Sequence, residues 1–204
     1  SPTEVGEVWH MLDNRFGIPV TLLPVNVLDK ASLNRYSTII LPPTVGTFSV
    51  SEGVKEKLKT WTQNGGVLIG LKNAINWFNS NGLGRFEIKK DEEKSEPVKP
   101  RAYADIEEFK GAQETTGAIL AAQADLTHPL LYGYYENTVP IFSSSNLFME
   151  KSKSPYSNPL IFTDAPLMSG YLSRDNYTKA QASSVAGVSV IGQGRVIGFT
   201  ENLC

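Results

Sequence analysis

Hydrophobic residues recur at helical spacing in two stretches of the first half of the chain. A first amphipathic helix is predicted over residues 2–15, with Gly17 ending it and with apolar positions Val5, Val8, Trp9 and Leu12. Ser1, Pro2 and Glu4 fit a capping box at its start. A second helix is predicted over 51–64, where Val54, Leu58 and Trp61 share one face. The tryptophans of these faces, together with Trp77, are predicted core residues.

Continuous apolar runs rich in β-branched residues alternate with these helices at residues 18–23, 36–42 and 67–71. Such runs are typical of strands that are covered on both faces. Strand, helix and strand at short intervals predict βαβ units. We therefore expect an α/β fold, a flavodoxin-like doubly wound and mostly parallel sheet with helices on both faces.

The second half has a different pattern. Further apolar strands are predicted at 117–122, 139–142, 160–163, 185–191 and 195–200. Gly192 and Gly194 lie between the last two runs and predict a hairpin turn. The sheet is accordingly expected to have a mixed or antiparallel edge.

Residues 84–114 are charged, contain two prolines and show weak periodicity. They predict an exposed insertion with a short helix near 104–110. We interpret residues 1–204 as a single domain that carries this insertion. The abrupt helix start and the strand near the other end suggest a fragment of a longer protein.

Composition narrows the function classes. The chain has 204 residues, a formal net charge of −2, 41% hydrophobic residues and 20% charged residues. Its basic residues form no stripe, so nucleic acid is not an expected partner. No apolar run reaches the roughly 20 residues of a membrane span. The one cysteine, Cys204, excludes an internal disulfide and a cysteine-rich zinc site.

The stretch from Gly70 to Ala74 follows a strand and precedes a helix, as does the turn that carries the nucleophile in many α/β enzymes. Lys72 stands where a serine or cysteine would stand. A desolvated lysine can act as a nucleophile, but no carboxylate partner is evident nearby. We therefore expect a solvated lysine at a turn and no catalytic residue.

Other candidate sites are sparse. His10 and Asp13 lie one helical turn apart, and no third ligand completes a metal site. His128 precedes a proline, where it is expected to bond the backbone and fix a turn, with binding as the alternative. Thr44 and Asn73 fall in the loops 42–48 and 72–76 at the C-terminal ends of strands, where open α/β sheets bind ligands.

Three segments carry a resemblance to a known family: VGEVWHMLDNRFGIPVTLLPV, YSTIILPP and LKTWTQNGGVLIGLKNAINWF. DLTHPLLYGY, PLMSGYLS and GQGRVIGFTENLC extend it over nearly the whole chain. Together they resemble a class I glutamine amidotransferase-like domain of the kind found C-terminal to the catalytic domain in large bacterial zinc carboxypeptidases, the carboxypeptidase A-like metallopeptidases. The resemblance implies a first strand before Ser1 and a last helix after Cys204.

Active amidotransferases carry a cysteine at the elbow with a histidine and a glutamate, and Lys72 departs from that pattern. The peptidase motif, His-x-x-Glu with a later His, is absent from these residues. The resemblance therefore implies no cofactor in this fragment and zinc in the catalytic domain of the parent. It also implies a periplasmic or extracellular location, although no signal peptide opens the chain.

Three functions remain open. The first is a non-catalytic accessory or interaction domain of a secreted zinc carboxypeptidase, which would contact the peptidase domain of its parent or form homo-oligomers. Tyr132, Tyr134 and Tyr135 are candidates for its contact surface. The second is a glycan- or peptide-binding module that uses the loops at the C-terminal strand ends. The third is an independent hydrolase or amidotransferase that uses Lys72, His128 or both.

Overall fold

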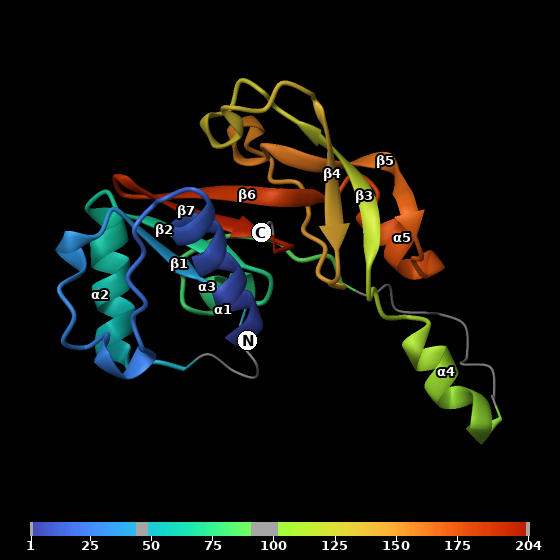
Figure 1. Cartoon of the computed structure of the whole chain (residues 1–204), viewed down its shortest axis with the longest axis horizontal. Coiled ribbons are helices and arrows are strands. Elements are labelled where there is room, and N and C mark those ends of the chain that lie inside the picture. The colour runs from blue at the N-terminus through green and yellow to red at the C-terminus, as the bar shows by residue number, and fades with distance from the viewer. Residues whose placement is uncertain (1, 44–48, 91–101, 203–204) are drawn as a thin grey trace. The chain divides into compact units, whose positions relative to one another are not determined.

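The computed structural model describes residues 2–43, 49–90 and 102–202 of the chain (Figure 1). The chain forms two compact units, residues 1–86 with 186–204 and residues 87–185. Within the described ranges there are seven strands and five α-helices.

The strands of the first unit follow one another in the order β1 (Thr38–Leu41), β2 (Val67–Leu71), β7 (Gly194–Phe199) and β6 (Ser184–Ile191). β6 begins two residues before this unit. β2 pairs in parallel with β1 and β7, whereas β6 and β7 form an antiparallel hairpin. Leu68 and Val196 are fully buried, so the centre of the core lies at β2 and β7.

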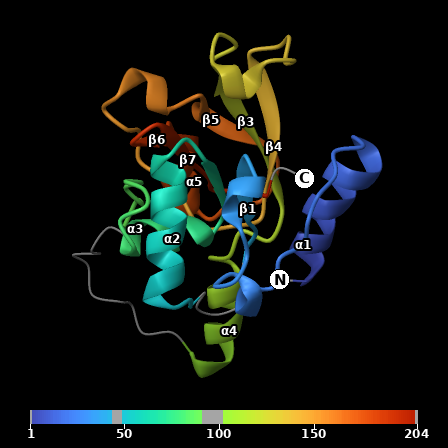
Figure 2. The ribbon, with the colours of Figure 1, turned by 90° about the vertical axis from the view of Figure 1, so that its left-hand side faces the viewer.

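The described α-helices of the first unit are α1 (Pro2–Trp9), α2 (Glu52–Gln63) and α3 (Ala74–Ser80). The same unit contains a π-helix, η1 (His10–Arg15), and two 3-10 turns, η2 (Val25–Val27) and η3 (Leu33–Arg35). The Ser51 side chain caps α2 by accepting a hydrogen bond from the Val54 backbone N–H at 3.3 Å. The apolar face predicted for α2 is buried. Figure 2 shows that α1 lies apart from α2 and α3.

A row of glycines lets α3 approach the sheet. Gly70 of β2 lies opposite Gly198 of β7, which lies opposite Gly187 of β6. A Cβ atom on Gly70 would overlap the Phe78 ring, and one on Gly198 would come within 2.9 Å of Ile75. Both of these α3 side chains are fully buried. The missing side chains of the strands therefore make room for those of the helix.

The second unit is built on antiparallel pairing. Its strands are β5 (Leu160–Gly170), β3 (Ala118–Ala124) and β4 (Thr138–Ser143), and β3 pairs antiparallel with both of the others. Buried and more exposed residues alternate along β3 and β4, as expected when one face of a sheet is covered. The helical segments are α4 (Ile106–Gly111), α5 (Arg174–Ala180), η4 (Tyr103–Asp105), η5 (Pro129–Leu131) and η6 (Pro155–Ser157).

A buried amide attaches α5 to the segment that leads into β3. Asn176 Nδ2 donates to Asn146 Oδ1 at 2.8 Å, to the Gln113 carbonyl at 2.8 Å and to Thr115 Oγ1 at 3.1 Å. Asn146 Oδ1 also accepts from the Thr115 backbone N–H at 2.9 Å. These bonds satisfy polar groups that would otherwise be costly to bury.

The expected doubly wound, mostly parallel sheet with helices on both faces is wrong. Of the strand pairings described, β1–β2 and β2–β7 are parallel, while β6–β7, β3–β4 and β3–β5 are antiparallel. Residues 18–23 form no strand, so one predicted βαβ unit is missing. Within residues 102–202, no α-helix separates β3 from β4, β4 from β5 or β6 from β7, so these connections lack the crossover helix that parallel pairing needs.

Other sequence predictions have mixed outcomes. The helices at 2–15 and 51–64, the strand at 67–71 and the hairpin around Gly192 are confirmed. α4 matches the short helix expected near 104–110, whereas residues 91–101 of the insertion lie outside the described residues. Trp61 and Trp77 are buried as predicted, but Trp9 is 38% exposed, so the face of α1 that carries it does not pack into the core.

We predict that Gly70→Ala lowers the free energy of unfolding by about 1–3 kcal/mol, the usual cost of overpacking a filled core. The added methyl group would overlap the fully buried Phe78 ring, so that the ring or the strand would have to shift. Urea denaturation, monitored by tryptophan fluorescence, measures this loss in the free energy of unfolding.

Gly53→Ala is the matched control, because a Cβ atom there meets only Ser51 Oγ, at 3.8 Å. In the first turn of α2, alanine should leave stability unchanged or raise it by up to about 1 kcal/mol. Equal stability of the two variants would contradict the close approach of α3 to β2.

Candidate functional site

The turn between β2 and α3 has the strained backbone expected of an elbow. Lys72 has a φ of 50°, and Lys72 and Ala182 are the two non-glycine residues with positive φ in the described ranges. The Lys72 backbone N–H donates to the Phe199 carbonyl at 2.7 Å, and its carbonyl accepts from Ile75 at 3.1 Å. A left-handed conformation costs an L-residue about 1–2 kcal/mol. The bonds on both sides hold Lys72 in that conformation.

The side chain of Lys72 is not the solvated lysine that the sequence predicts. Its Nζ donates to Glu4 Oε1 of α1 at 3.2 Å, and the two side chains are 18% and 21% exposed. The carboxylate partner comes from a position 68 residues away, which explains why local inspection of the sequence found none. Partial burial strengthens the pair over an exposed one, for which less than about 1 kcal/mol is usual.

Polar residues that the sequence analysis missed follow β7 at the same edge of the sheet. Thr200 and Glu201 are fully buried, and Asn202 donates through Nδ2 to Glu7 Oε2 of α1. Because β2 and β7 are parallel, their carboxyl ends meet, and Lys72 itself bonds to the last residue of β7. The sequence did contain a signal for these residues, because Thr, Glu and Asn directly follow an apolar strand.

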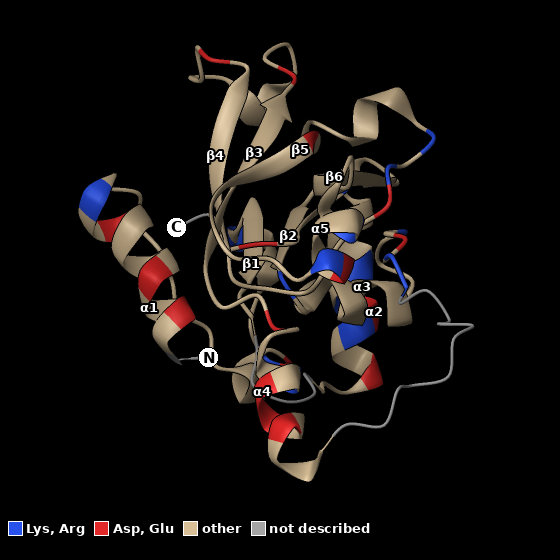
Figure 3. Cartoon of the chain, turned by 90° about the vertical axis from the view of Figure 1, so that its right-hand side faces the viewer, with Lys and Arg blue, Asp and Glu red and all other residues tan. Residues whose placement is uncertain are grey.

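Asn202 has one polar atom without a partner. Its Oδ1 is buried, and no residue in the described part of the chain donates a hydrogen bond to it. A buried acceptor that has given up water without a replacement is costly. We use the name Lys72 edge for Lys72, Glu201 and Asn202 together with Glu4 and Glu7 of α1. Figure 3 shows acidic residues of α1 in red.

Of the predicted binding residues at the strand ends, Asn73 is exposed and precedes the first turn of α3, where its carbonyl accepts from Asn76 at 3.1 Å. Thr44 lies outside the described residues. Asn73 thus lies next to Lys72 in the turn that follows β2.

His128 belongs to the second unit and fixes a turn, as predicted. It caps η5, where its Nδ1 accepts from the Leu130 backbone N–H at 3.2 Å. Asp125 accepts from Thr127 Oγ1 at 2.6 Å and from the Thr127 backbone N–H at 3.0 Å. These bonds, above all the one from the Thr127 hydroxyl, and the nearby His128 lower the pKa of Asp125 from its ordinary value of 3.8.

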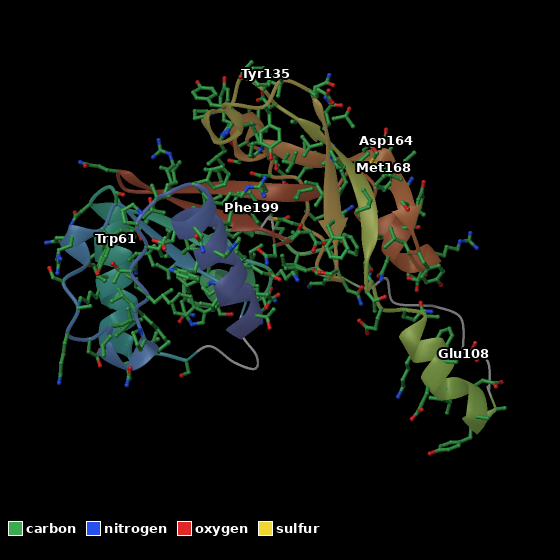
Figure 4. All side chains as sticks on the ribbon, viewed as in Figure 1. Trp61, Glu108, Tyr135, Asp164, Met168 and Phe199 are labelled. Atoms are coloured by element: carbon green, nitrogen blue, oxygen red, sulfur yellow. The ribbon has the colours of Figure 1, made fainter. Side chains whose placement is uncertain are left out.

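The contact surface proposed for the second unit is exposed. Tyr132, Tyr134 and Tyr135 lie between η5 and β4, and Tyr135 is 92% exposed (Figure 4). The prediction that these three side chains contact a partner stays a prediction.

In residues 2–43, 49–90 and 102–202, no group of three or more His, Cys, Asp and Glu side chains could hold a metal ion. Within the same residues, no helix is both long enough and apolar enough to cross a membrane.

The groups that meet at the Lys72 edge are an ammonium, carboxylates and an amide. An ammonium that donates to a carboxylate has no free electron pair with which to attack a substrate. No serine or cysteine stands at the elbow position itself. The edge combines a positive group with carboxylates and a buried acceptor, which suits recognition of a polar ligand.

Comparison with known proteins supports the fold alone. No family model and no curated protein matches the chain. A ThuA-like protein from Parabacteroides merdae matches 97% of this chain and 74% of its own, with a TM-score of 0.58 and 10% identity. A ThuA-like protein from Bacteroides uniformis matches 98% and 74%, with a TM-score of 0.54 and 12% identity.

ThuA-like proteins have a class I glutamine amidotransferase-like fold, so the chain is similar to that fold. Of the expected resemblance, the class I glutamine amidotransferase-like fold is confirmed. None of the comparisons links the chain to carboxypeptidases.

We predict that Thr127→Val raises the pKa of Asp125 toward its ordinary value, because valine keeps the shape of threonine and removes the hydroxyl donor. Carbon-detected NMR titration of the Asp125 carboxyl measures both pKa values.

A carboxyl whose pKa is lower in the folded chain stabilises the fold above its unfolded pKa, and that stability is lost as the pH falls through the folded value. The turn at 125–128 should therefore loosen on acidification. Thr178→Val, which removes an exposed hydroxyl on α5, is the control and should leave the Asp125 titration unchanged. An unchanged titration in Thr127→Val would contradict the assignment.

Proposed function

We propose that this chain is a non-catalytic binding and interaction domain on a glutamine amidotransferase-like fold, with the Lys72 edge as its binding site. The observation that carries the proposal is the ion pair of Lys72 with Glu4, at the position where related folds place a nucleophile. The elbow keeps its backbone conformation while its side chain donates a hydrogen bond.

Two features of the molecule support binding over catalysis. The strained elbow is held by hydrogen bonds to β7 and α3, so Nζ extends from a fixed backbone. The edge also contains Asn202 Oδ1, a buried acceptor that lacks a donor among the described residues. A fixed cation and an unsatisfied acceptor are the features by which a site orients a polar ligand.

The finer part of the proposal concerns the parent protein. An accessory role beside the peptidase domain of a secreted zinc carboxypeptidase, in the periplasm or outside the cell, rests on the resemblance of the sequence segments. Tyr132, Tyr134 and Tyr135 would supply the contact surface for that domain or for a second copy of this chain, because exposed aromatic rings are favoured in interfaces.

The alternative within the same class is a glycan- or peptide-binding module. The exposed Asn73 beside Lys72 favours it, because an amide both donates and accepts hydrogen bonds with sugar hydroxyls or peptide groups. An independent amidotransferase or hydrolase is the competing class, and the first experiment addresses it.

We expect 6-diazo-5-oxo-L-norleucine, an electrophilic glutamine analogue, to leave the intact mass of the chain unchanged. Glutamate release from L-glutamine should match that of a buffer blank. Lys72→Gln should give the same two results, because in the wild type the ammonium is already held by Glu4.

An active glutamine amidotransferase treated in parallel shows that the reagent and the assay work. An adduct on Lys72, or glutamine hydrolysis that Lys72→Gln abolishes, would overturn the proposal and make this chain an enzyme.

A further inference from the structure

The fixed position of Lys72 is the starting point for identifying a ligand class. The backbone of Lys72 is bonded to Phe199 and Ile75, and its Nζ lies 3.2 Å from Glu4 Oε1. A carboxylate is thus already bound at this position, and it belongs to a side chain of α1. A carboxylate supplied by a ligand would make the same charge-assisted hydrogen bond.

α1 has few apolar contacts to hold it at the edge. Among residues 3–15, Val8 alone is classed as buried, and Trp9 is 38% exposed. Two side-chain hydrogen bonds connect α1 to the edge: Lys72 donates to Glu4, and Asn202 donates to Glu7. A helix that buries little apolar surface separates at a lower cost than one that buries an apolar face.

The buried acceptor of Asn202 adds a second requirement. Its Nδ2 bonds to Glu7 while its Oδ1 has no donor in the described part of the chain. A simple carboxylate has no donor to offer this atom. A hydroxyl group on the same ligand would donate to it and remove the penalty of an unsatisfied buried acceptor.

We propose that the Lys72 edge binds a hydroxylated carboxylate, such as a sugar acid, whose carboxylate displaces Glu4 from Lys72 and whose hydroxyl donates to Asn202. α1 is the cover of the site, and it leaves the edge when the ligand binds. This inference rests on the proposed function, because it requires Lys72 to bind a ligand and not to react with one.

The test is isothermal titration calorimetry of the full chain at low ionic strength with D-glucuronate. Glu4→Gln removes the internal competitor, so a larger fraction of molecules has Lys72 available, and the affinity should rise at least about tenfold. Lys72→Gln and the double variant should lose that binding. D-glucose, which lacks the carboxylate, should not bind, and acetate, which lacks hydroxyls, should bind more weakly than D-glucuronate.

Glu52→Gln is the matched control, because it removes a carboxylate from an exposed ion pair with Lys55 on α2. It should leave the affinity for D-glucuronate at the wild-type value. Amide hydrogen exchange of the wild-type chain tests the inference without a variant. D-glucuronate should speed the exchange of the α1 amides and leave the exchange of the α2 amides unchanged.

Three results would overturn the inference: no binding of D-glucuronate by the wild type and Glu4→Gln, binding that Lys72→Gln retains, or binding that Glu4→Gln abolishes. The last result would assign Glu4 to a cation site. Failure of this kind is distinct from failure of the proposed function, which would appear as labelling of Lys72 or as glutamine hydrolysis.

Discussion

The close approach of α3 to β2 and β7 is the constraint on which the first unit depends. It requires glycine at Gly70 and Gly198, which face each other across the parallel pair. The space is filled by Ile75 and Phe78, both fully buried. Because Lys72 and Asn73 alone lie between β2 and α3, this packing also dictates how sharply the chain turns between them. The left-handed conformation of Lys72 is the result, and its cost is offset by the core it allows.

The same constraint explains why the polar groups of the Lys72 edge gather where they do. Parallel pairing of β2 with β7 joins segments far apart in the sequence, and both leave the core at one edge. Lys72 follows one strand, and Thr200, Glu201 and Asn202 follow the other. Their combination of a cation, a buried carboxyl group and an amide is therefore a property of strand register, which no short sequence motif expresses.

Local features of the first unit were predictable because they depend on neighbouring residues. Ser51 before an apolar helical face predicts the α2 start, and Gly65 to Leu71 predicts the buried strand β2 and the elbow. Pairing direction was harder to predict. β3 and β4 bury alternate residues, as antiparallel strands with one covered face do, but their small and β-branched residues resemble the continuous apolar runs of parallel strands.

Long-range partners were the other limit. The sequence predicts that Glu4 belongs to a capping box, and nothing in the local sequence indicates that its carboxylate pairs with Lys72. Trp9 has the spacing of a core residue, yet helical periodicity predicts a face without saying what covers it. The structural likeness to ThuA-like proteins at 10–12% identity carries the same lesson, because the backbone arrangement is shared while few residues are.

The elbow also separates two properties that evolution can change independently. Its backbone conformation is determined by glycines, α3 packing and main-chain hydrogen bonds, none of which involves the Lys72 side chain. A lineage can therefore exchange the residue at this position, and gain or lose a reactive group, without rebuilding the turn. The backbone of the turn can therefore be retained while its function changes. The chemistry at this edge then depends on the residue at position 72 and on the few polar residues that follow β7.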